Sequence, residues 1–418
     1  MEKSRLSLII VSLVLVCSMV FNLSGCSMEV QAQNLMDNIK PNHVETLDKS
    51  NSYNADVTDF AIRLFKKSEE SGKNTLISPL SVLYALAMTA NGSEGETLQQ
   101  METVLGMKTE ELNKYLYSYM KKLPQNDYYK FNLANSIWFT EDEHFKINQD
   151  FLQTNADYYG ADIYKAPFNN QTLKDINNWV NKKTDKMIPK ILDELPPEAV
   201  MCLVNALVFD AEWSEIYQEN DVEKGKFTKE DGTKQNAEFM RGMESIYLED
   251  EKATGFMKHY RDDKYAFVAM LPKEEISISE YIASLNGESV NKLLTNPQYT
   301  LVSTELPKFE TEYTVEMPEI LKNMGMPKAF NEKKAEFKKL GTSIDGNIFI
   351  ENVIHKTFIS VNEKGTKAGA ATAVMIYKEA LSPINIKKVH LNRPFVYMLI
   401  DCENNIPFFI GTMMDIKK

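Results

Sequence analysis

The chain has 418 residues, of which 43% are hydrophobic, so it can bury a large core. Its formal net charge is −12, which argues against nucleic acid as a partner, because a phosphate-binding surface needs a clustered excess of basic residues. The nearest such groups, Lys182 with Lys183 and Lys387 with Lys388, are short and fit solvated faces.

The N-terminus carries the clearest local signal. Lys3 and Arg5 precede an apolar run over residues 6–21, and residues 23–26 read Leu-Ser-Gly-Cys. A short basic region followed by about 15 apolar residues is typical of a secretory signal and too short for a spanning helix. The last four positions resemble a bacterial lipobox, in which Cys26 becomes the lipidated first residue of an exported protein anchored to the outer face of the membrane. The alternative is an ordinary cleaved signal with an incidental cysteine.

These features divide the chain into three parts. We predict a signal peptide over residues 1–25, a polar tether over residues 26–52 that holds the folded part off a membrane surface, and one domain over residues 53–418 without internal repeats or linkers. Cys202 and Cys402 lie inside apolar runs and are expected to be buried and inert. A disulfide between them stays open as the alternative.

Helix signals dominate the first half of the domain. Apolar residues recur at helical spacing from Asn54 onward, and Ser78 and Pro79 suit the cap and first turn of a second, almost wholly apolar helix. Ser78 and Ser81 will need hydrogen-bond partners there, because both enter a buried helix. Further helices are predicted over residues 94–105, 109–123, 145–155 and 176–186, with a strand over residues 131–140.

Strand signals dominate the second half. Residues 200–213 form an almost continuous apolar run that predicts a strand buried on both faces, with Asn205 as a polar insertion. Other strands are predicted over residues 226–228, 237–240, 245–248, 252–259, 265–271, 301–309, 348–361, 389–400 and 407–413, and helices over residues 276–285, 289–294 and 314–324. Helices followed by sheets favour an α+β fold class.

The common catalytic and metal-binding signatures are absent. The sequence has no HExxH, CxxC, GxxxxGK(S/T) or GxSxG motif, and its five histidines are scattered without ligand spacing. We therefore expect no enzyme activity, no metal and no cofactor, although a Ser/His/Asp enzyme would leave no local motif. His355 lies in an apolar strand and is most simply a buried, hydrogen-bonded histidine of the core.

One stretch near the C-terminus differs from the rest of the chain. Residues 363–380 read EKGTKAGAATAVMIYKEA, and residues 365–373 contain only Gly, Thr and Ala apart from one Lys. Composition alone fits a flexible linker, but strand-like segments flank the stretch on both sides, so that there is no domain for it to link. We therefore predict a long exposed loop that belongs to the fold.

Seven groups of segments resemble the serpin family and occur in the family's order. They are NTLISPLSVLYALAMTANGSEGETLQQM, FNLANSIWF, INNWVNKKTDKMIPKIL, LVNALVFDAEW, LPKFE followed by LKNMGMPKAF, VIHKTFISVNEKGTKAGAATAV, and LNRPFVYMLID with PFFIGTM. This resemblance spans nearly the whole folded part. It implies a serpin fold with three β-sheets, eight or nine helices and an exposed reactive loop over residues 363–383.

The resemblance also implies an irreversible suicide-substrate inhibitor of serine, or papain-like cysteine, proteases. The nucleophile of the target attacks the loop to form an acyl-enzyme, and the cut loop then inserts as a new central strand of the main sheet. A metastable native state, a covalent one-to-one complex with the protease and a monomeric inhibitor follow. The alternative within the family is a non-inhibitory serpin that acts as a binding or carrier protein.

The small residues of the loop would suit such an insertion. Successive residues of a strand face opposite sides, so Thr366, Ala368 and Ala370 would face the core, where a charge should block insertion. The small side chains favour the inhibitory type. The predicted hinge comprises Glu363, Gly365, Thr366, Ala368, Gly369, Ala370, Ala371, Thr372 and Ala373.

The length of the inserted strand places the scissile bond. About 16 residues counted from Glu363, roughly 53 Å of extended strand, end at Glu379, so we predict cleavage between Glu379 and Ala380. If Lys378 is read instead, trypsin-like or papain-like proteases become the targets, and Tyr377 would indicate chymotrypsin-like or subtilisin-like ones.

The resemblance assigns structural roles to five further residues. It places Ser78, Ser81, Asn205 and His355 in a polar cluster beneath the point where the main sheet opens. It identifies Trp213 with the aromatic residue at the position where the loop first inserts.

Overall fold

The computed structural model describes residues 30–47, 53–123, 129–142, 144–196, 199–344, 346–366 and 386–416. The predicted signal peptide, Cys26, the hinge positions from Ala368 to Ala373 and the bond between Glu379 and Ala380, with its alternative at Lys378, lie outside the described residues. Within the described ranges, no helix is both long enough and apolar enough to cross a membrane.

The described part of the chain contains nine α-helices and three β-sheets, which confirms the α+β serpin fold class. Six helices precede the long strands of the second half, and three short ones interrupt those strands. The helices are α2 (Asn54–Ser68), α3 (Pro79–Ala90), α4 (Gly95–Leu105), α5 (Thr109–Lys122), α6 (Gln149–Tyr159), α7 (Asn170–Lys183), α8 (Ile278–Ser284), α9 (Gly287–Thr295) and α10 (Pro318–Met324).

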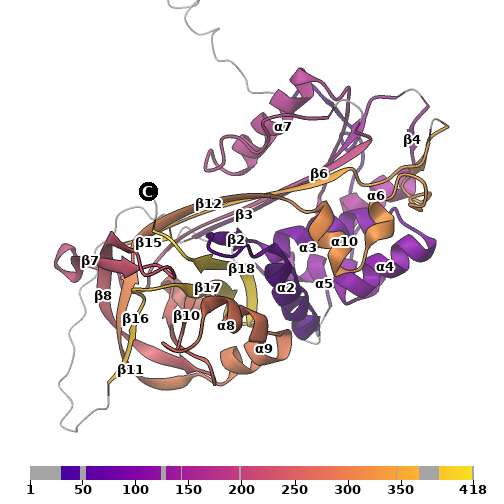
Figure 1. Cartoon of the computed structure of the whole chain (residues 1–418). Coiled ribbons are helices and arrows are strands. Elements are labelled where there is room, and N and C mark those ends of the chain that lie inside the picture. The colour runs from indigo at the N-terminus through magenta and orange to yellow at the C-terminus, as the bar shows by residue number, and fades with distance from the viewer. Residues whose placement is uncertain are drawn as a thin grey trace, which may run out of the picture.

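The seven-stranded sheet, called the main sheet below, crosses the whole molecule (Figure 1). Helix α7 lies on one face and α3 packs on the other, against the two longest strands. In spatial order the strands are β1 (Gln33–Asn34), β5 (Asp162–Ala166), β3 (Tyr129–Thr140), β6 (Met201–Glu212), β15 (Gly365–Thr366), β14 (Asn352–Asn362) and β12 (Phe309–Glu316). The predicted burial of β6 on both faces is confirmed, since only its C-terminal end is partly exposed.

The second sheet has nine strands and curls beneath one end of the main sheet (Figure 1). Its path is β16 (Lys387–His390), β11 (Gln298–Pro307), β8 (Lys234–Glu249), β9 (Ala253–His259), β10 (Tyr265–Pro272), β17 (Phe395–Asp401), β18 (Ile406–Met413) and β2 (Thr75–Ile77), while β7 (Val222–Thr228) pairs with β8. The third sheet joins β13 (Gly341–Thr342) to β4 (Lys146–Ile147).

Helix α3 begins as its sequence predicts. Ser78 is the N-cap, its hydroxyl accepts a hydrogen bond from the Ser81 N–H at 3.3 Å, and Pro79 occupies the first turn. All twelve residues of the helix are buried, because it lies between the main sheet and the other helices. Ser78 and Ser81 are therefore fixed at the centre of the molecule.

Two predicted boundaries are wrong where a distant segment captures the backbone. The helix predicted over residues 145–155 begins only at Gln149, because Lys146 and Ile147 pair with β13. The helix predicted over residues 314–324 begins at Pro318, because the preceding residues continue β12.

Three strand predictions are also wrong in their number of pieces. Residues 237–240 and 245–248 belong to the single strand β8. Residues 301–309 are instead two strands that part at Lys308, and residues 389–400 are divided between β16 and β17 around Pro394. Proline has no N–H to donate to a strand ladder, which explains the last break.

The N-terminal segment differs from the solvated spacer that its composition suggests. β1 pairs with β5, and the N–H groups of Gln31 and Ala32 both donate to Oδ2 of Asp175, at 3.0 and 2.9 Å. Further along, the Leu47 N–H donates to Oγ of Ser118 at 2.8 Å. Residues 30–47 thus run from the edge of the main sheet to α5, which they contact largely through backbone groups.

The two cysteines of the domain are both free thiols. Cys202 is buried in β6 and Cys402 lies just after β17. The alternative of a disulfide between them is therefore not realised, and burial raises the pKa of Cys402 to about 12.

Candidate functional site

The start of the predicted reactive loop turns back into the main sheet. After β14 ends at Asn362, Glu363 and Lys364 form a turn, and β15 then lies between β14 and β6. Thr366 pairs with Val361 on one side and with Ala211 on the other. The first two strand residues of the hinge are thus already in the position of a central strand.

Thr366 is 1% exposed, as the predicted alternation of the hinge requires. Its hydroxyl and that of Tyr260 are 2.5 Å apart. Gly365 has a φ of 155°, and a Cβ atom at this position would collide with the Ala211 carbonyl. A side chain is therefore excluded at Gly365 by the close approach of β6.

An ion pair fixes the turn that precedes β15. Oε1 of Glu363 lies 2.6 Å from Nζ of Lys308, which also lies 3.1 Å from Oε2 of Glu238. Burial alone would raise the pKa of Glu363, but the hydrogen bond and charge of Lys308 outweigh it and lower this pKa. The side chains of Glu363 and Lys308 are 31% and 29% exposed, so solvent screens the pair in part.

Trp213 holds the same turn from within the protein. Its backbone N–H donates to the Lys364 carbonyl at 2.8 Å, and its indole N–H donates to the Asn362 carbonyl at 2.9 Å. The indole also stacks on Tyr260, with ring centroids 4.4 Å apart. The structure therefore places Trp213 where the loop first inserts, at the position that the sequence resemblance assigns.

A buried ion pair lies beneath this tryptophan. Nζ of Lys258 is 2.8 Å from Oε1 of Glu244, and it lies 4.5 Å from the ring centroid of Tyr217 and 5.6 Å from that of Trp213. Lys258 is 3% exposed, so the aromatic faces and the carboxylate together replace its hydration. The support of Trp213 is thus itself fully ordered by charge.

Below the hinge, the main sheet is closed. Residues Asn352 to Thr357 of β14 pair directly, in parallel, with Cys202 to Leu207 of β6. Between this closed part and β15, the facing edges of residues 208–210 and 358–360 have no strand partner among the described residues. A strand that continued from Thr366 would first cross this gap and would then have to separate β6 from β14.

His355 and Asn205 face each other at the centre of the closed part. Nδ1 of His355 contacts Oδ1 of Asn205, and Nε2 of His355 accepts the Ser78 N–H at 2.9 Å. Because Nε2 accepts a hydrogen bond, the imidazole carries its proton on Nδ1 and donates it to Asn205. Burial lowers the pKa of His355 to about 3, so the ring is neutral at pH 7.

The structure thus brings together Ser78, Asn205 and His355, but it uses the two serines differently from the prediction. Ser78 reaches His355 through its backbone N–H, while its hydroxyl caps α3. The hydroxyl of Ser81 is buried and makes no hydrogen bond within the described part of the chain. Ser81 contributes to the cluster through its backbone alone.

Sequence reasoning missed Tyr260, Tyr217 and Lys308, which all contact the hinge. The Tyr217 N–H donates to the Glu363 carbonyl at 2.9 Å. These residues lie on segments far from the hinge in sequence, and nothing in their spacing connects them to it. Lys308, the single charged residue between two strand-like runs, carried the only local signal.

Comparisons with known proteins place this geometry. A family model described as Serpin (serine protease inhibitor) matches residues 55–416. An uncharacterised serpin-like protein of Thermococcus kodakarensis is 28% identical over 371 residues, which cover 86% of this chain and 85% of that protein.

Two solved structures of a thermophilic serpin, tengpin, are also similar. The native state of tengpin is 51% identical, with a TM-score of 0.89, over 92% of this chain and 100% of that one. The latent state of tengpin gives 46% identity and a TM-score of 0.78, over 90% of this chain and 100% of that one.

Proposed function

The chain belongs to the serpin family, whose members are protease inhibitors and not enzymes, and we propose that it is an irreversible suicide-substrate inhibitor of endopeptidases. The observation that carries the proposal is the position of Gly365 and Thr366, which lie between β6 and β14 while those strands are joined directly below. A hinge in this position can lead the loop into the sheet without first finding its path.

The closed sheet gives the proposal a source of free energy. Insertion of the loop would add a strand between β6 and β14 and so satisfy the facing backbone groups of residues 208–210 and 358–360. Greater likeness to the native than to the latent state of tengpin supports a starting state before insertion. The free energy released by insertion would trap the acyl-enzyme before water hydrolyses it.

We infer a serine endopeptidase as the target, with a papain-like cysteine protease as the second class. The proposed scissile bond joins Glu379 to Ala380, and Lys378 is the alternative residue read by the protease. Cleavage there would leave about 16 residues after Glu363 for insertion, roughly 53 Å of strand.

The test uses the exported chain from residue 26 onward, with Cys26→Ser to prevent lipidation. It is incubated with proteases that cleave after acidic, basic or aromatic residues, and the same proteases with blocked nucleophiles serve as controls. We expect an SDS-stable covalent complex with at least one active protease, and a new N-terminus at Ala380 by mass spectrometry. The absence of any complex, together with no thermal stabilisation after loop cleavage, would overturn the proposal.

We also propose that the mature protein is anchored to the outer face of the cell membrane through a lipid on Cys26. The support is the sequence of residues 3–26, with its basic start, apolar run and lipobox-like end. Cells that express the full chain should retain it in the membrane fraction, and Cys26→Ser should release it. Equal membrane retention of the two forms would contradict the lipid anchor.

A further inference from the structure

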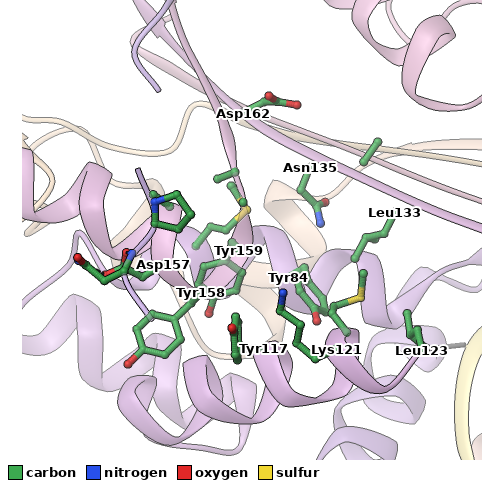
Figure 2. Close-up of a pocket in the computed structure, with 18 of the residues that line it drawn as sticks. Tyr84, Tyr117, Lys121, Leu123, Leu133, Asn135, Asp157, Tyr158, Tyr159 and Asp162 are labelled. Atoms are coloured by element: carbon green, nitrogen blue, oxygen red, sulfur yellow. Dashed lines mark hydrogen bonds between the residues drawn. The ribbon is translucent and has the colours of Figure 1, made fainter. Parts of the chain in front are cut away.

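A cavity of about 880 Å³ lies beside the main sheet (Figure 2). It is enclosed by β3, by helices α3, α5 and α6, and by residues 41–43 of the N-terminal segment. Its volume falls within the range of about 300–1,000 Å³ that is typical of small-molecule sites. No hinge residue lines it, so the proposed function leaves the cavity without a role.

Tyrosine rings form much of the cavity wall. Tyr84 and Tyr159 meet edge to face, with ring centroids 5.9 Å apart. Their hydroxyls donate to the Leu116 carbonyl and to Oδ1 of Asn113, each at 2.5 Å, and neither acceptor lines the cavity. The hydroxyls thus fix the rings and leave aromatic surface for a ligand. The tyrosines of the lining are Tyr84, Tyr117, Tyr158 and Tyr159.

Two hydrogen-bond donors in the cavity have no acceptor. The amine of Lys121 lies 5.4 Å from the centroid of the Tyr117 ring, and no carboxylate pairs with it in the described part of the chain. The carboxamide of Asn135 makes no hydrogen bond there either, although its Oδ1 is buried. In Figure 2 the two side chains point into the cavity, Lys121 from α5 and Asn135 from β3.

The carboxylates of the cavity, by contrast, are satisfied. Asp157 accepts the Asn42 N–H at 2.7 Å, and its other oxygen accepts the Asn42 side-chain amide at 3.1 Å. Asp162 lies 2.5 Å from Nζ of Lys183 and accepts the indole N–H of Trp179 at 3.1 Å. The unmet demand of the cavity is therefore for an acceptor, and an anionic one suits Lys121 best.

We propose that this cavity binds a small aromatic anion. The carboxylate or sulfonate of such a ligand accepts hydrogen bonds from Nζ of Lys121 and from the amide nitrogen of Asn135, and its ring packs against Tyr84 and Tyr159. Charge-assisted hydrogen bonds and aromatic contacts then act together in one site. The proposal does not depend on the proposed function, because binding can be measured on a protein that inhibits nothing.

The position of Asn135 connects the cavity to the closed part of the main sheet. Asn135 lies opposite Asn205 in the pairing of β3 with β6, and Asn205 lies opposite His355 in the pairing of β6 with β14. Oδ1 of Asn135 and Nδ2 of Asn205 are both buried without a hydrogen bond among the described residues. A ligand that holds the amide nitrogen of Asn135 leaves Oδ1 to accept from Asn205. The ligand would then lie one strand away from the His355 contact.

The test compares an anionic probe, 8-anilinonaphthalene-1-sulfonate, with its uncharged analogue N-phenyl-1-naphthylamine, by fluorescence titration of the exported chain carrying Cys26→Ser. We expect one site that prefers the anion. Lys121→Met should weaken the anionic probe about tenfold, which corresponds to about 1.4 kcal/mol, and leave the uncharged probe unchanged. Asn135→Leu should act in the same direction. Lys174→Met, at an exposed lysine of α7, is the matched control and should change neither probe.

Ala156→Trp provides a second arm, because Ala156 of α6 lines the cavity and a larger side chain would fill it. This variant should lose both probes while its circular dichroism spectrum remains that of the parent protein. Equal affinity for the two probes, or an unchanged affinity for the anionic probe in both Lys121→Met and Asn135→Leu, would overturn the proposal. Undiminished binding to a folded Ala156→Trp variant would place the probe elsewhere and overturn it as well. If that variant does not fold, the Lys121→Met comparison decides alone.

Discussion

The same two strands, β6 and β14, are held in different ways at the mouth and in the middle of the main sheet. At the mouth, Thr366 separates the strands, and the turn before it is fixed by an ion pair of Glu363 that is about one-third exposed. In the middle the strands pair directly, and His355 and Asn205 are 0% exposed. Exposed ion pairs contribute about 1 kcal/mol or less, whereas breaking buried polar contacts costs more. The difference indicates a sheet that opens from the mouth and is kept closed by its middle.

The largest expected effect follows from a charge at the mouth. Thr366→Arg would place a guanidinium in a position that is 1% exposed, at a cost of several kcal/mol. The hinge should then be expelled from the sheet, and the protease should hydrolyse the loop without being trapped. We expect SDS-stable complexes to disappear and the intact inhibitor to be converted to cleaved product.

The matched control is Thr366→Val, which keeps the shape of the side chain and loses only the contact with Tyr260. It should still form the covalent complex. Complex formation by Thr366→Arg at the rate of the parent protein would contradict the assignment of Thr366 as an inserted core position.

A smaller effect is expected in the middle of the sheet. His355→Ala leaves the Ser78 N–H and the Asn205 carboxamide without their partner, which should cost about 2–4 kcal/mol. The native state should lose thermal stability, by roughly 4–8 °C for a domain of this size, and convert faster to an inserted, inactive form. Incubation at a temperature below unfolding, followed by assay of residual inhibition, measures that conversion.

Thr357→Val is the control for this change, because it removes a buried hydrogen bond to the Leu76 carbonyl without altering the contact between β14 and β6. It should lower stability by about 1 kcal/mol and leave the conversion rate nearly unchanged. Equal stability and equal conversion in the parent and His355→Ala proteins would show that this contact does not keep the sheet closed.

Acid should act on the middle in the same way. The pKa of His355 is about 3 in the native state against an ordinary value of 6.5, so the unfolded chain binds a proton that the native state does not bind between these values. The contribution of His355 to stability is therefore complete above about pH 6.5, falls as the pH decreases toward 3, and amounts to a few kcal/mol. The slope of unfolding free energy against pH in this window should be shallower in His355→Ala; an identical slope would contradict this origin.

The smallest effect is expected for the ion pair at the mouth. Glu363→Gln should cost about 0.5–1 kcal/mol, because the pair with Lys308 is partly exposed. A double-mutant cycle with Lys308→Met isolates the pair, and its coupling energy should fall as salt increases. A coupling energy larger than the loss in His355→Ala would reverse the comparison between mouth and middle.

The sequence predicts the middle of the sheet better than the mouth. Asn205 and His355 each interrupt an apolar strand, so a polar contact between them could be expected once the family's order of segments was clear. The contribution of Ser78 could be expected only in part, because a backbone N–H that bonds a distant imidazole leaves no mark on residue type.

The mouth depends on contacts that sequence patterns do not carry. Alternation of side chains indicates which face Thr366 takes after insertion, but not that Thr366 is paired with β6 before the loop is cut. Likewise, the polar residues of the N-terminal segment suggest a solvated spacer, yet their backbone groups bind β5, α7 and α5. Long-range backbone pairing is independent of local composition, so it appears only in the folded structure.

The docking of the N-terminal segment sets how far the protein can stand from a membrane. Gln31 is already bonded to Asp175, so only five residue steps (31 − 26) separate it from the proposed anchor at Cys26, about 17 Å even when fully extended. On so short a leash the inhibitor would have little freedom to swing toward distant proteases. Because β1 is a strand of the main sheet, any pull on the anchor would also act as a force on the sheet that must open.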